Sequence, residues 1–291
     1  MSDKLKEHYG ITVPLGAAAT ITERHAHALS DDDVTPPPRP GVTPLTLIAE
    51  ADGSMIPVVQ ITDAPTDAGD RRKRRTLQWK EARLSLVRRP DQTEPTFAVT
   101  LGDATATGNA LKRLALTAGL NRRTRVHGVG DGAPWIAEQV EIQFGAQGRY
   151  LIDFYHLCDY LAAAAPVCAP TQPGGWLNCQ KERLKTGQLD AVMAVLAPHI
   201  EADTVASDQA PVRNCYRYIA NRPGQFDYAK AIATNLPIGS GEVESAHRYV
   251  IQKRLKLPGA WWKPANAQAM LNLRSMRANH RWGDYWNKTA A

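Results

Sequence analysis

The sequence predicts an α/β fold with a mixed five-stranded sheet and flanking helices, interrupted by an all-helical insertion. Three strand-like segments come first, at 45–52 (continuing as extended chain over 56–61), 76–87 and 97–101. A helix, a strand, a helix and a strand follow, and the rest of the chain has a helical pattern. Three antiparallel strands followed by alternating helices and strands is the element order of an RNase H-like fold.

The strand predictions rest on alternation and turn signals. LTLIAEAD (45–52) is a short β-leaning run that ends on Asp52-Gly53, a turn signal. TLQWKEARLSLV (76–87) alternates large apolar and polar residues, which is typical of a half-buried strand. The fourth strand is predicted at 124–129, running into Asp131-Gly132, and the fifth at 149–154.

Helical periodicity begins after the third strand. Leu111, Leu114 and Ala115 lie on one face of a helix predicted over 106–119, and Gly119 stops it. Pro134 favours the start of a short helix over 134–144. Later helices are predicted at 156–165, 176–197, 211–221, 225–233, 241–256 and 264–279.

Composition excludes several classes of protein. The 291 residues are 43% hydrophobic and 22% charged, which excludes global disorder. No apolar run reaches about 18 residues, so a membrane span is not expected. The N-terminus lacks the apolar core of a secretory signal, and the four cysteines form no CxxC pair. We therefore expect a reduced, cytoplasmic protein.

The net charge of +6 is concentrated in two blocks. Residues 71–90 carry nine Lys or Arg against one Glu, and residues 241–291 carry nine against three acidic residues. Such blocks favour nucleic acid as a partner, although a run such as 71–75 is equally typical of a solvated loop. The cations predicted to bind DNA are Arg71, Arg72, Lys73, Arg74, Arg75, Arg248, Lys253, Arg254 and Lys256.

Three acidic residues fall where this fold would bring them together. Asp52 ends the first strand, Asp131 follows the fourth, and Glu244 opens a late helix that would pack beside them. Oxygen ligands of this kind suit Mg²⁺, and a pair of such ions about 4 Å apart supports phosphodiester chemistry. Each residue also has a simpler interpretation, because Asp-Gly is common in turns and a helix dipole favours Glu244. Glu242 competes with Glu244, since positions two apart point in different directions on a helix.

A second polar pair follows the fifth strand. Asp153 and His156 are three residues apart, where strand becomes helix, so they could be a metal ligand and a proton or phosphate partner. Equally, Asp153 could cap the helix that begins near His156. Asp153 is also an alternative metal ligand beside Asp131.

The late helix is entered through Ile238-Gly239-Ser240-Gly241, which could seat a phosphate or be a plain entry loop. Beyond it, tryptophans alternate with cations, a pattern suited to stacking on unpaired bases. Core packing is the more common role for such tryptophans.

Several phrases together resemble one family of mobile elements. They are ADGSMIPV (51–58), WKEARL (79–84), GVGDGAPWI (128–136), LIDFYHLCDYL (151–161), IGSGEVESAHRYVIQKRLK (238–256) and AWWKPANAQAMLNLRSMRAN (260–279). In this order they resemble the DDE transposases of the ISKra-four insertion-sequence family, which belongs with Mutator-like transposases. The resemblance runs from about residue 45 to the end.

The resemblance implies a transposase that cleaves and joins DNA with two Mg²⁺ or Mn²⁺ ions held by Asp52, Asp131 and Glu244. The GSGxVE motif favours Glu244 over Glu242, and Asp153 and His156 match the D-x-x-H signature. It also implies double-stranded DNA at transposon ends and target as the partner, a homodimer on DNA, and a bacterial, nucleoid-associated location. Family members look longer, so we expect residues 8–29 to be the tail of an N-terminal DNA-binding region in a truncated copy.

Four segments are expected: an N-terminal remnant with a proline-rich, extended linker (1–44, the linker from 31), the first part of the catalytic core (45–161), a helical insertion (162–235), and the last catalytic helix with a basic helical tail (236–291). Two alternatives stay open. The chain could be a catalytically incompetent DNA-binding remnant or an RNase H-like nuclease.

Overall fold

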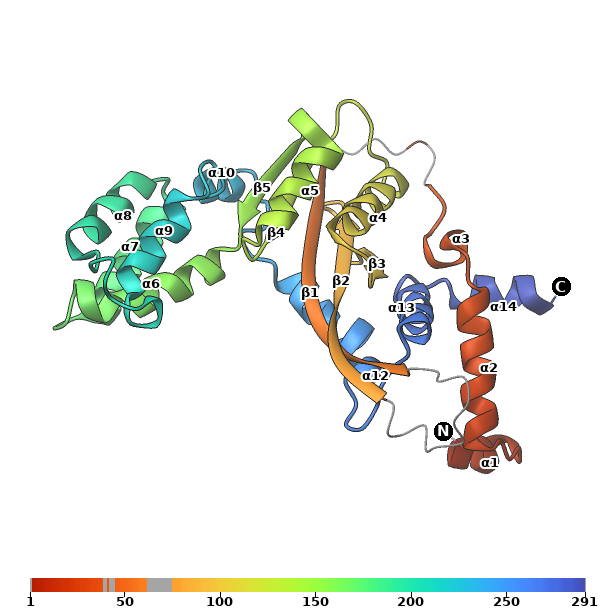
Figure 1. The fold of residues 1–291 in the computed structure, drawn as a ribbon. Coiled ribbons are helices and arrows are strands. Elements are labelled where there is room, and N and C mark those ends of the chain that lie inside the picture. Colours follow the sequence, from red (N-terminus) through yellow and green to blue (C-terminus); the bar gives the residue numbers. More distant parts are fainter. Residues whose placement is uncertain (1, 39–40, 42–44, 62–74, 291) are drawn as a thin grey trace.

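The architecture comes from a computed structural model that describes residues 2–38, 41, 45–61 and 75–290. Its sheet has five strands in the order β3-β2-β1-β4-β5 (Figure 1). They are β1 (Thr46–Ile61), β2 (Arg75–Arg88), β3 (Thr96–Thr100), β4 (Arg125–Gly130) and β5 (Gly148–Ile152). β1, β2 and β3 are antiparallel neighbours, whereas β4 and β5 run parallel to β1. This mixed sheet confirms the predicted RNase H-like fold.

One strand prediction was wrong. β1 does not end at a turn at Asp52-Gly53 but continues as a single strand to Ile61. The ladder with β2 passes through this point, pairing Asp52 with Leu84 and Gly53 with Arg83. Beyond it, Ile56 and Val58 are buried in the core, so apolar packing favours continued strand over a turn.

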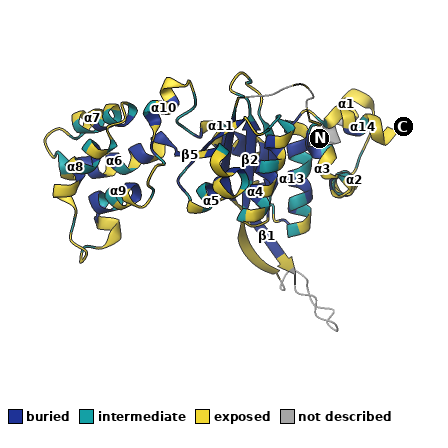
Figure 2. Ribbon diagram, turned by 90° about the horizontal axis from the view of Figure 1, so that it is seen from above, coloured by how far each residue is buried: buried dark blue, intermediate teal, exposed yellow. Residues whose placement is uncertain are grey.

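Helices cover both faces of the sheet. On one face α4 (Ala104–Thr117) and α5 (Pro134–Phe144) pack on Leu47, Ala49 and Ala51 of β1. On the other face α11 (Gly241–Ala246) and α13 (Pro264–Ala278) pack on Ile56 and Val58 of the same strand. Alternating residues of β1 therefore enter two separate cores, and Figure 2 shows the buried sheet between these helices.

A helical block follows β5 and lies beyond that edge of the sheet in Figure 1. It contains α6 (Phe154–Cys168), α7 (Pro173–Lys185), α8 (Leu189–Leu196), α9 (Pro211–Ala220) and α10 (Tyr228–Ala233), with short 3₁₀ turns at Ala197–His199 and Ser207–Gln209. These helices share one core, which reaches back to Leu151 and Ile152 of β5. The single helix predicted over 176–197 is divided, because Gly187 adopts a positive φ of 76° between α7 and α8. The four predicted segment boundaries stay predictions.

The helix predicted over 241–256 is not one regular α-helix. After α11 the chain forms a π-helical segment at His247–Gln252 and then the short α12 (Lys253–Leu255). Single turns of π-helix are rare and often occur at functional sites.

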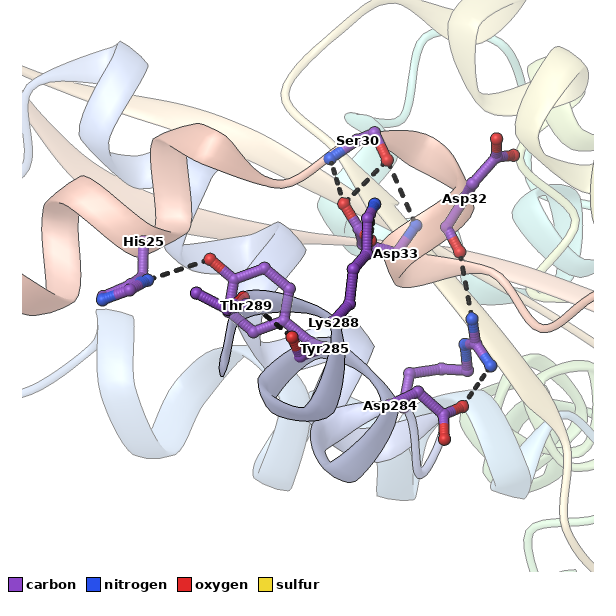
Figure 3. Close-up of polar contacts among 9 residues, drawn as sticks. His25, Ser30, Asp32, Asp33, Asp284, Tyr285, Lys288 and Thr289 are labelled. Atoms are coloured by element: carbon purple, nitrogen blue, oxygen red, sulfur yellow. Dashed lines mark hydrogen bonds and ion pairs between the residues drawn. The ribbon is translucent and has the colours of Figure 1, made fainter. Parts of the chain in front are cut away.

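The N-terminal segment packs against the C-terminal end of the chain through two of its helices. The segment contains α1 (Ser2–Tyr9), α2 (Leu15–Ala28) and α3 (Asp31–Val34), and the C-terminal helix is α14 (Trp282–Ala290). Of these three, α2 and α3 pack on α13. Figure 3 shows His25 of α2 hydrogen-bonded to the Tyr285 hydroxyl of α14 (2.9 Å) and Lys288 beside Asp33. Ser30 and Asp33 form a capping box that starts α3, so the linker predicted to be extended from residue 31 begins with a helical turn.

Within the described ranges, every helix is too short or too polar to traverse a lipid bilayer.

Candidate functional site

Two of the predicted acidic residues lie at the same level of the sheet, Asp52 on β1 and Asp131 directly after β4. The parallel register of β1 and β4 places Glu50 opposite Val129, two residues before Asp52 and Asp131. Continuing that register places Asp52 beside Asp131 on strands that lie about 4.8 Å apart. Asp52 and Asp131 are 79 positions apart in the sequence, which is the same separation as between the paired residues Glu50 and Val129 of β1 and β4.

Asp153, directly after β5, extends this row to a third position. β4 and β5 pair Gly130 with Ile152, and Asp131 and Asp153 are the residues that follow. The backbone N–H of Asp153 donates to the carbonyl of Gly130 at 2.7 Å, so the two chains are still side by side at this point. The row of Asp52, Asp131 and Asp153 is called the aspartate row below.

Asp52 lies on the face of the sheet that α11 and the π-helical segment cover. Its Oδ1 accepts the N–H of Gly53 (2.7 Å), and its Oδ2 lies 3.0 Å from Nε2 of His247. The His247 side chain is buried, with only 4% of its surface exposed, whereas that of Asp52 is 27% exposed. The buried His247 ring therefore lies against one side of the Asp52 side chain, which is still partly exposed to solvent on its other side.

Asp131 lies in a tight loop that the helical block holds from outside. Its Oδ1 accepts the N–H of Ala133 (2.8 Å), which is the turn geometry expected of Asp-Gly. Its carbonyl accepts the hydroxyl of Tyr218 on α9 (2.7 Å). Arg222 donates from Nε to the carbonyl of Gly132 (3.0 Å) and stacks over the Tyr218 ring at 4.0 Å. The helical block thus contributes directly to the position of Asp131.

Gly132 is required at this loop for two independent reasons. Its φ is +88°, and a Cβ there would lie 2.2 Å from the Tyr218 hydroxyl. Gly259 has a similar φ of +74° but open space around it. We expect Gly259→Ala to destabilise the fold by about 1–2 kcal/mol from backbone strain alone, and Gly132→Ala by about 1–3 kcal/mol more from the clash. Urea unfolding of both variants measures the difference, and equal losses would contradict the contact with Tyr218.

Asp153 is the N-cap of α6, as one interpretation of the sequence proposed. Its side chain is buried, and its Oδ1 accepts the N–H groups of Tyr155 (2.6 Å) and His156 (3.1 Å). Its Oδ2 accepts both the N–H and the hydroxyl of Ser240 (2.6 and 2.7 Å). Four hydrogen bonds engage both oxygens, so Asp153 joins β5, α6 and the entry to α11. A metal-ligating role for Asp153 stays a prediction.

The structure separates the two glutamates of α11. Glu242 forms an ion pair with Nε of Arg88 on β2 at 2.7 Å. Glu244 is exposed, but desolvation raises its pKa, and the carboxylates of Asp153 and Asp52 raise it further. The charges of Asp52 and Asp153 therefore act on Glu244, whereas Glu242 is paired with Arg88.

His156 is a further polar residue near Tyr218, which contacts the Asp131 loop. It is exposed on the first turn of α6, and its ring centroid lies 6.2 Å from that of Tyr218. Together with His247 it lowers the pKa of Glu244, opposing the carboxylates. The imidazole thus lies near the Tyr218 ring that contacts the Asp131 loop, and its charge acts on Glu244.

Glu50 is a further acidic residue that the sequence analysis missed. It lies two residues before Asp52 on the same face of β1, is 1% exposed, and accepts the N–H of Val243 at 2.9 Å. Burial raises its pKa to about 8, so the carboxyl is largely protonated at neutral pH. A charged residue inside the apolar run of 45–52 was the sequence feature that could have identified Glu50. Its hydrogen bond to Val243 joins the first turn of α11 to the sheet.

The donor set suits a hard divalent cation, because Asp52, Asp131 and Glu244 offer only carboxylate oxygens. Desolvation is the main cause of the raised pKa of Glu244, and the carboxylates of Asp153 and Asp52 add to it, a repulsion that a bound cation would relieve. In the part of the chain that the structure describes, no three His, Cys, Asp or Glu side chains converge closely enough to hold one ion. Binding would therefore need side-chain rotation at the row.

The predicted DNA-binding cations fall into two groups. Arg71, Arg72, Lys73 and Arg74 lie outside the described residues, and Arg75 is the exposed first residue of β2. The second group, Arg248, Lys253, Arg254 and Lys256, is exposed along the π-helical segment and α12. Arg254 lies over the ring of Trp262, which is buried and packs in the core, whereas Trp261 is exposed.

A family model described as "Uncharacterised protein family (UPF0236)" matches residues 120–288, more than half of the chain. The chain belongs to this family. The match includes Asp131, Asp153, His156 and Glu244 and begins after Asp52.

Among solved structures, the chain is similar to the Drosophila P element transposase strand transfer complex, with 9% sequence identity and a TM-score of 0.28 over 90% of this chain and 69% of that chain. A TM-score this low supports no inference about fold or function. No curated protein matches the chain.

Proposed function

We propose that this UPF0236 protein is a DDE transposase of the ISKra-four type, which cleaves and joins double-stranded DNA as a homodimer. The observation that carries the proposal is the register of β1, β4 and β5, which aligns Asp52, Asp131 and Asp153, with Glu244 of α11 beside them. A row of acidic residues on an RNase H-like sheet, covered by an acidic helix, has the donor chemistry for divalent metal ions.

Asp52, Asp131 and Glu244 would hold two Mg²⁺ or Mn²⁺ ions. Such ions supply an activated oxygen nucleophile and stabilise the leaving oxygen of a phosphodiester. The residues around them have separate tasks. His247 would orient Asp52. Tyr218 and Arg222 would fix the Asp131 loop. The exposed His156 would contact the scissile phosphate.

The exposed cations Arg248, Lys253, Arg254 and Lys256 would hold the DNA backbone. Four phosphate contacts predict that affinity for duplex DNA falls about 100-fold between 50 and 200 mM salt. Lys253→Ala combined with Arg254→Ala should lower the slope of log affinity against log salt by about 2. Fluorescence anisotropy of a labelled duplex measures both quantities, and an affinity independent of salt would refute this role.

Incubation of the protein with supercoiled plasmid tests the proposed reaction. We expect nicked and joined products with Mg²⁺ and neither when a chelator replaces the metal. Cut products without joined ones would identify an RNase H-like nuclease instead. DNA binding without any Mg²⁺-dependent product would identify a binding remnant.

A further inference from the structure

A second site lies at the opposite ends of β4 and β5 from the aspartate row. A cavity of about 590 Å³ opens between the first residues of these strands and helix α10 of the helical block. Arg125 begins β4, Arg149 is the second residue of β5, and Lys230 lies on α10. All three line the cavity, so cations from three elements surround one space.

The positive charge of this cavity is not neutralised. Among the described residues, no carboxylate lies within ion-pair distance of Arg125, Arg149 or Lys230. Arg125 donates from Nη1 to the carbonyl of Ala146 (3.0 Å), which orients its guanidinium. Its other guanidinium N–H groups have no hydrogen-bond partner among the residues that the structure describes. The acidic member of the described lining is Asp227, whose carboxylate accepts the backbone N–H of Lys230 and caps α10. A ligand that enters the cavity therefore meets an excess of cationic donors.

The walls between the cations are apolar. Val126, Tyr150, Leu151 and Leu236 line them, and Val126 and Leu151 are buried. A ligand that matches this surface combines an apolar part, which can stack on the Tyr150 ring, with an anionic group, and 590 Å³ lies within the range of small-ligand sites. Arginine pairs are well suited to bidentate contact with phosphate.

We propose that this cavity binds a nucleotide unit, with its phosphate held by Arg125, Arg149 and Lys230 and its base against the apolar wall. The unit could belong to a free nucleotide or to a strand of DNA. The site is separate from the carboxylates proposed to bind metal ions, so its occupancy does not depend on the proposed transposase activity.

Two side chains that line the cavity also contact the segments that carry Asp131 and Glu244. The Tyr150 ring lines it, while the Tyr150 hydroxyl accepts the N–H of Gly132 at 3.1 Å, next to Asp131. His127 lines it too, and its Nε2 lies 2.8 Å from the carbonyl of Pro237, on the segment that leads to α11. A bound nucleotide would therefore contact side chains that touch the segments bearing Asp131 and Glu244.

Isothermal titration calorimetry tests the site with four probes: adenosine monophosphate, adenosine, inorganic phosphate and a single-stranded dodecamer. We expect adenosine monophosphate or the dodecamer to bind saturably, and adenosine and phosphate at least tenfold more weakly, because each lacks half of the contacts. Because the dodecamer can also bind the exposed cations Arg248, Lys253, Arg254 and Lys256, the source of the ligand is read from the loss of binding in Arg125→Ala/Arg149→Ala. A larger loss for the monophosphate assigns the site to free nucleotides, and a larger loss for the dodecamer assigns it to DNA.

The variant Arg125→Ala/Arg149→Ala should weaken binding of the preferred probe at least about tenfold, because a charge-assisted hydrogen bond contributes that much. Lys6→Ala/Lys263→Ala removes the same charge from exposed positions elsewhere and should leave this binding unchanged. Asp131→Asn should also bind as the wild type does, which separates this site from the proposed function. Unchanged binding by Arg125→Ala/Arg149→Ala, or no saturable binding of either nucleotide probe, would overturn the proposal.

Discussion

Asp131→Asn is expected to abolish Mg²⁺-dependent plasmid nicking while the protein stays folded. The amide keeps the size of the side chain and an oxygen that can accept the Ala133 N–H (2.8 Å), so the loop geometry is preserved. The substitution removes the negative charge with which the Asp131 carboxylate would bind a divalent cation. Loss of an outer-shell partner of a metal site costs about 10–100-fold, so loss of a direct ligand should cost at least about 100-fold. Initial rates of nicking measure the effect.

The control for this substitution is Asp190→Asn, which makes the same chemical change at an exposed position on α8 of the helical block. It should nick DNA at the wild-type rate. Unfolding curves of Asp131→Asn and the wild type should coincide within about 1 kcal/mol, because the hydrogen bond to Ala133 is kept. Nicking that survives Asp131→Asn would contradict a catalytic role for the aspartate row.

Asp153→Ala is expected to destabilise the fold by about 3–5 kcal/mol. The substitution removes the N-cap of α6 and both bonds to Ser240, and it leaves the buried N–H of Ser240 without its acceptor. The free energy of unfolding of an ordinary domain is about 5–15 kcal/mol, so a loss of this size should shift the urea denaturation curve strongly. Asp153→Asn keeps one acceptor oxygen and should recover part of the loss.

A matched control exists at the start of α4. Asp103 is also an N-cap but is exposed and accepts one N–H, from Ala106 at 2.8 Å. Asp103→Ala should cost about 1 kcal/mol, the usual value for a single exposed cap. If Asp153→Ala cost no more than Asp103→Ala, the bonds between Asp153 and Ser240 would not hold α11 to the sheet.

The sequence predicted the sheet well because each strand carries its own local signal. Alternation identified β2, and the Asp-Gly motif marked the loop after β4. The spacing of Asp52 and Asp131 proved to be a strand register, which explains why their position in the chain could indicate proximity. The turn at Asp52-Gly53 failed because a local turn preference was overridden by pairing with Leu84 and Arg83 across the sheet.

The surroundings of the site could not be predicted from the sequence in the same way. Tyr218 reaches the Asp131 loop from α9, and Arg222 reaches it from the turn just after α9. The two lie 87 and 90 positions away from their acceptors, and nothing local marks such contacts. Likewise, Glu242 and Glu244 are equivalent in composition and differ only in what they face. Arg88, on a distant strand, engages Glu242 and leaves Glu244 beside the aspartates.

A titration of the metal-free protein with Mn²⁺, followed by electron paramagnetic resonance, tests the central claim most directly. Our account predicts that the wild type binds two Mn²⁺ ions per chain and that Asp52→Asn, Asp131→Asn and Glu244→Gln each weaken this binding at least about tenfold. Glu242→Gln, which alters the neighbour paired with Arg88, should bind as the wild type does. Wild-type Mn²⁺ binding in Asp131→Asn, or no Mn²⁺ binding in the unmodified chain, would contradict the claim that these carboxylates form one metal centre.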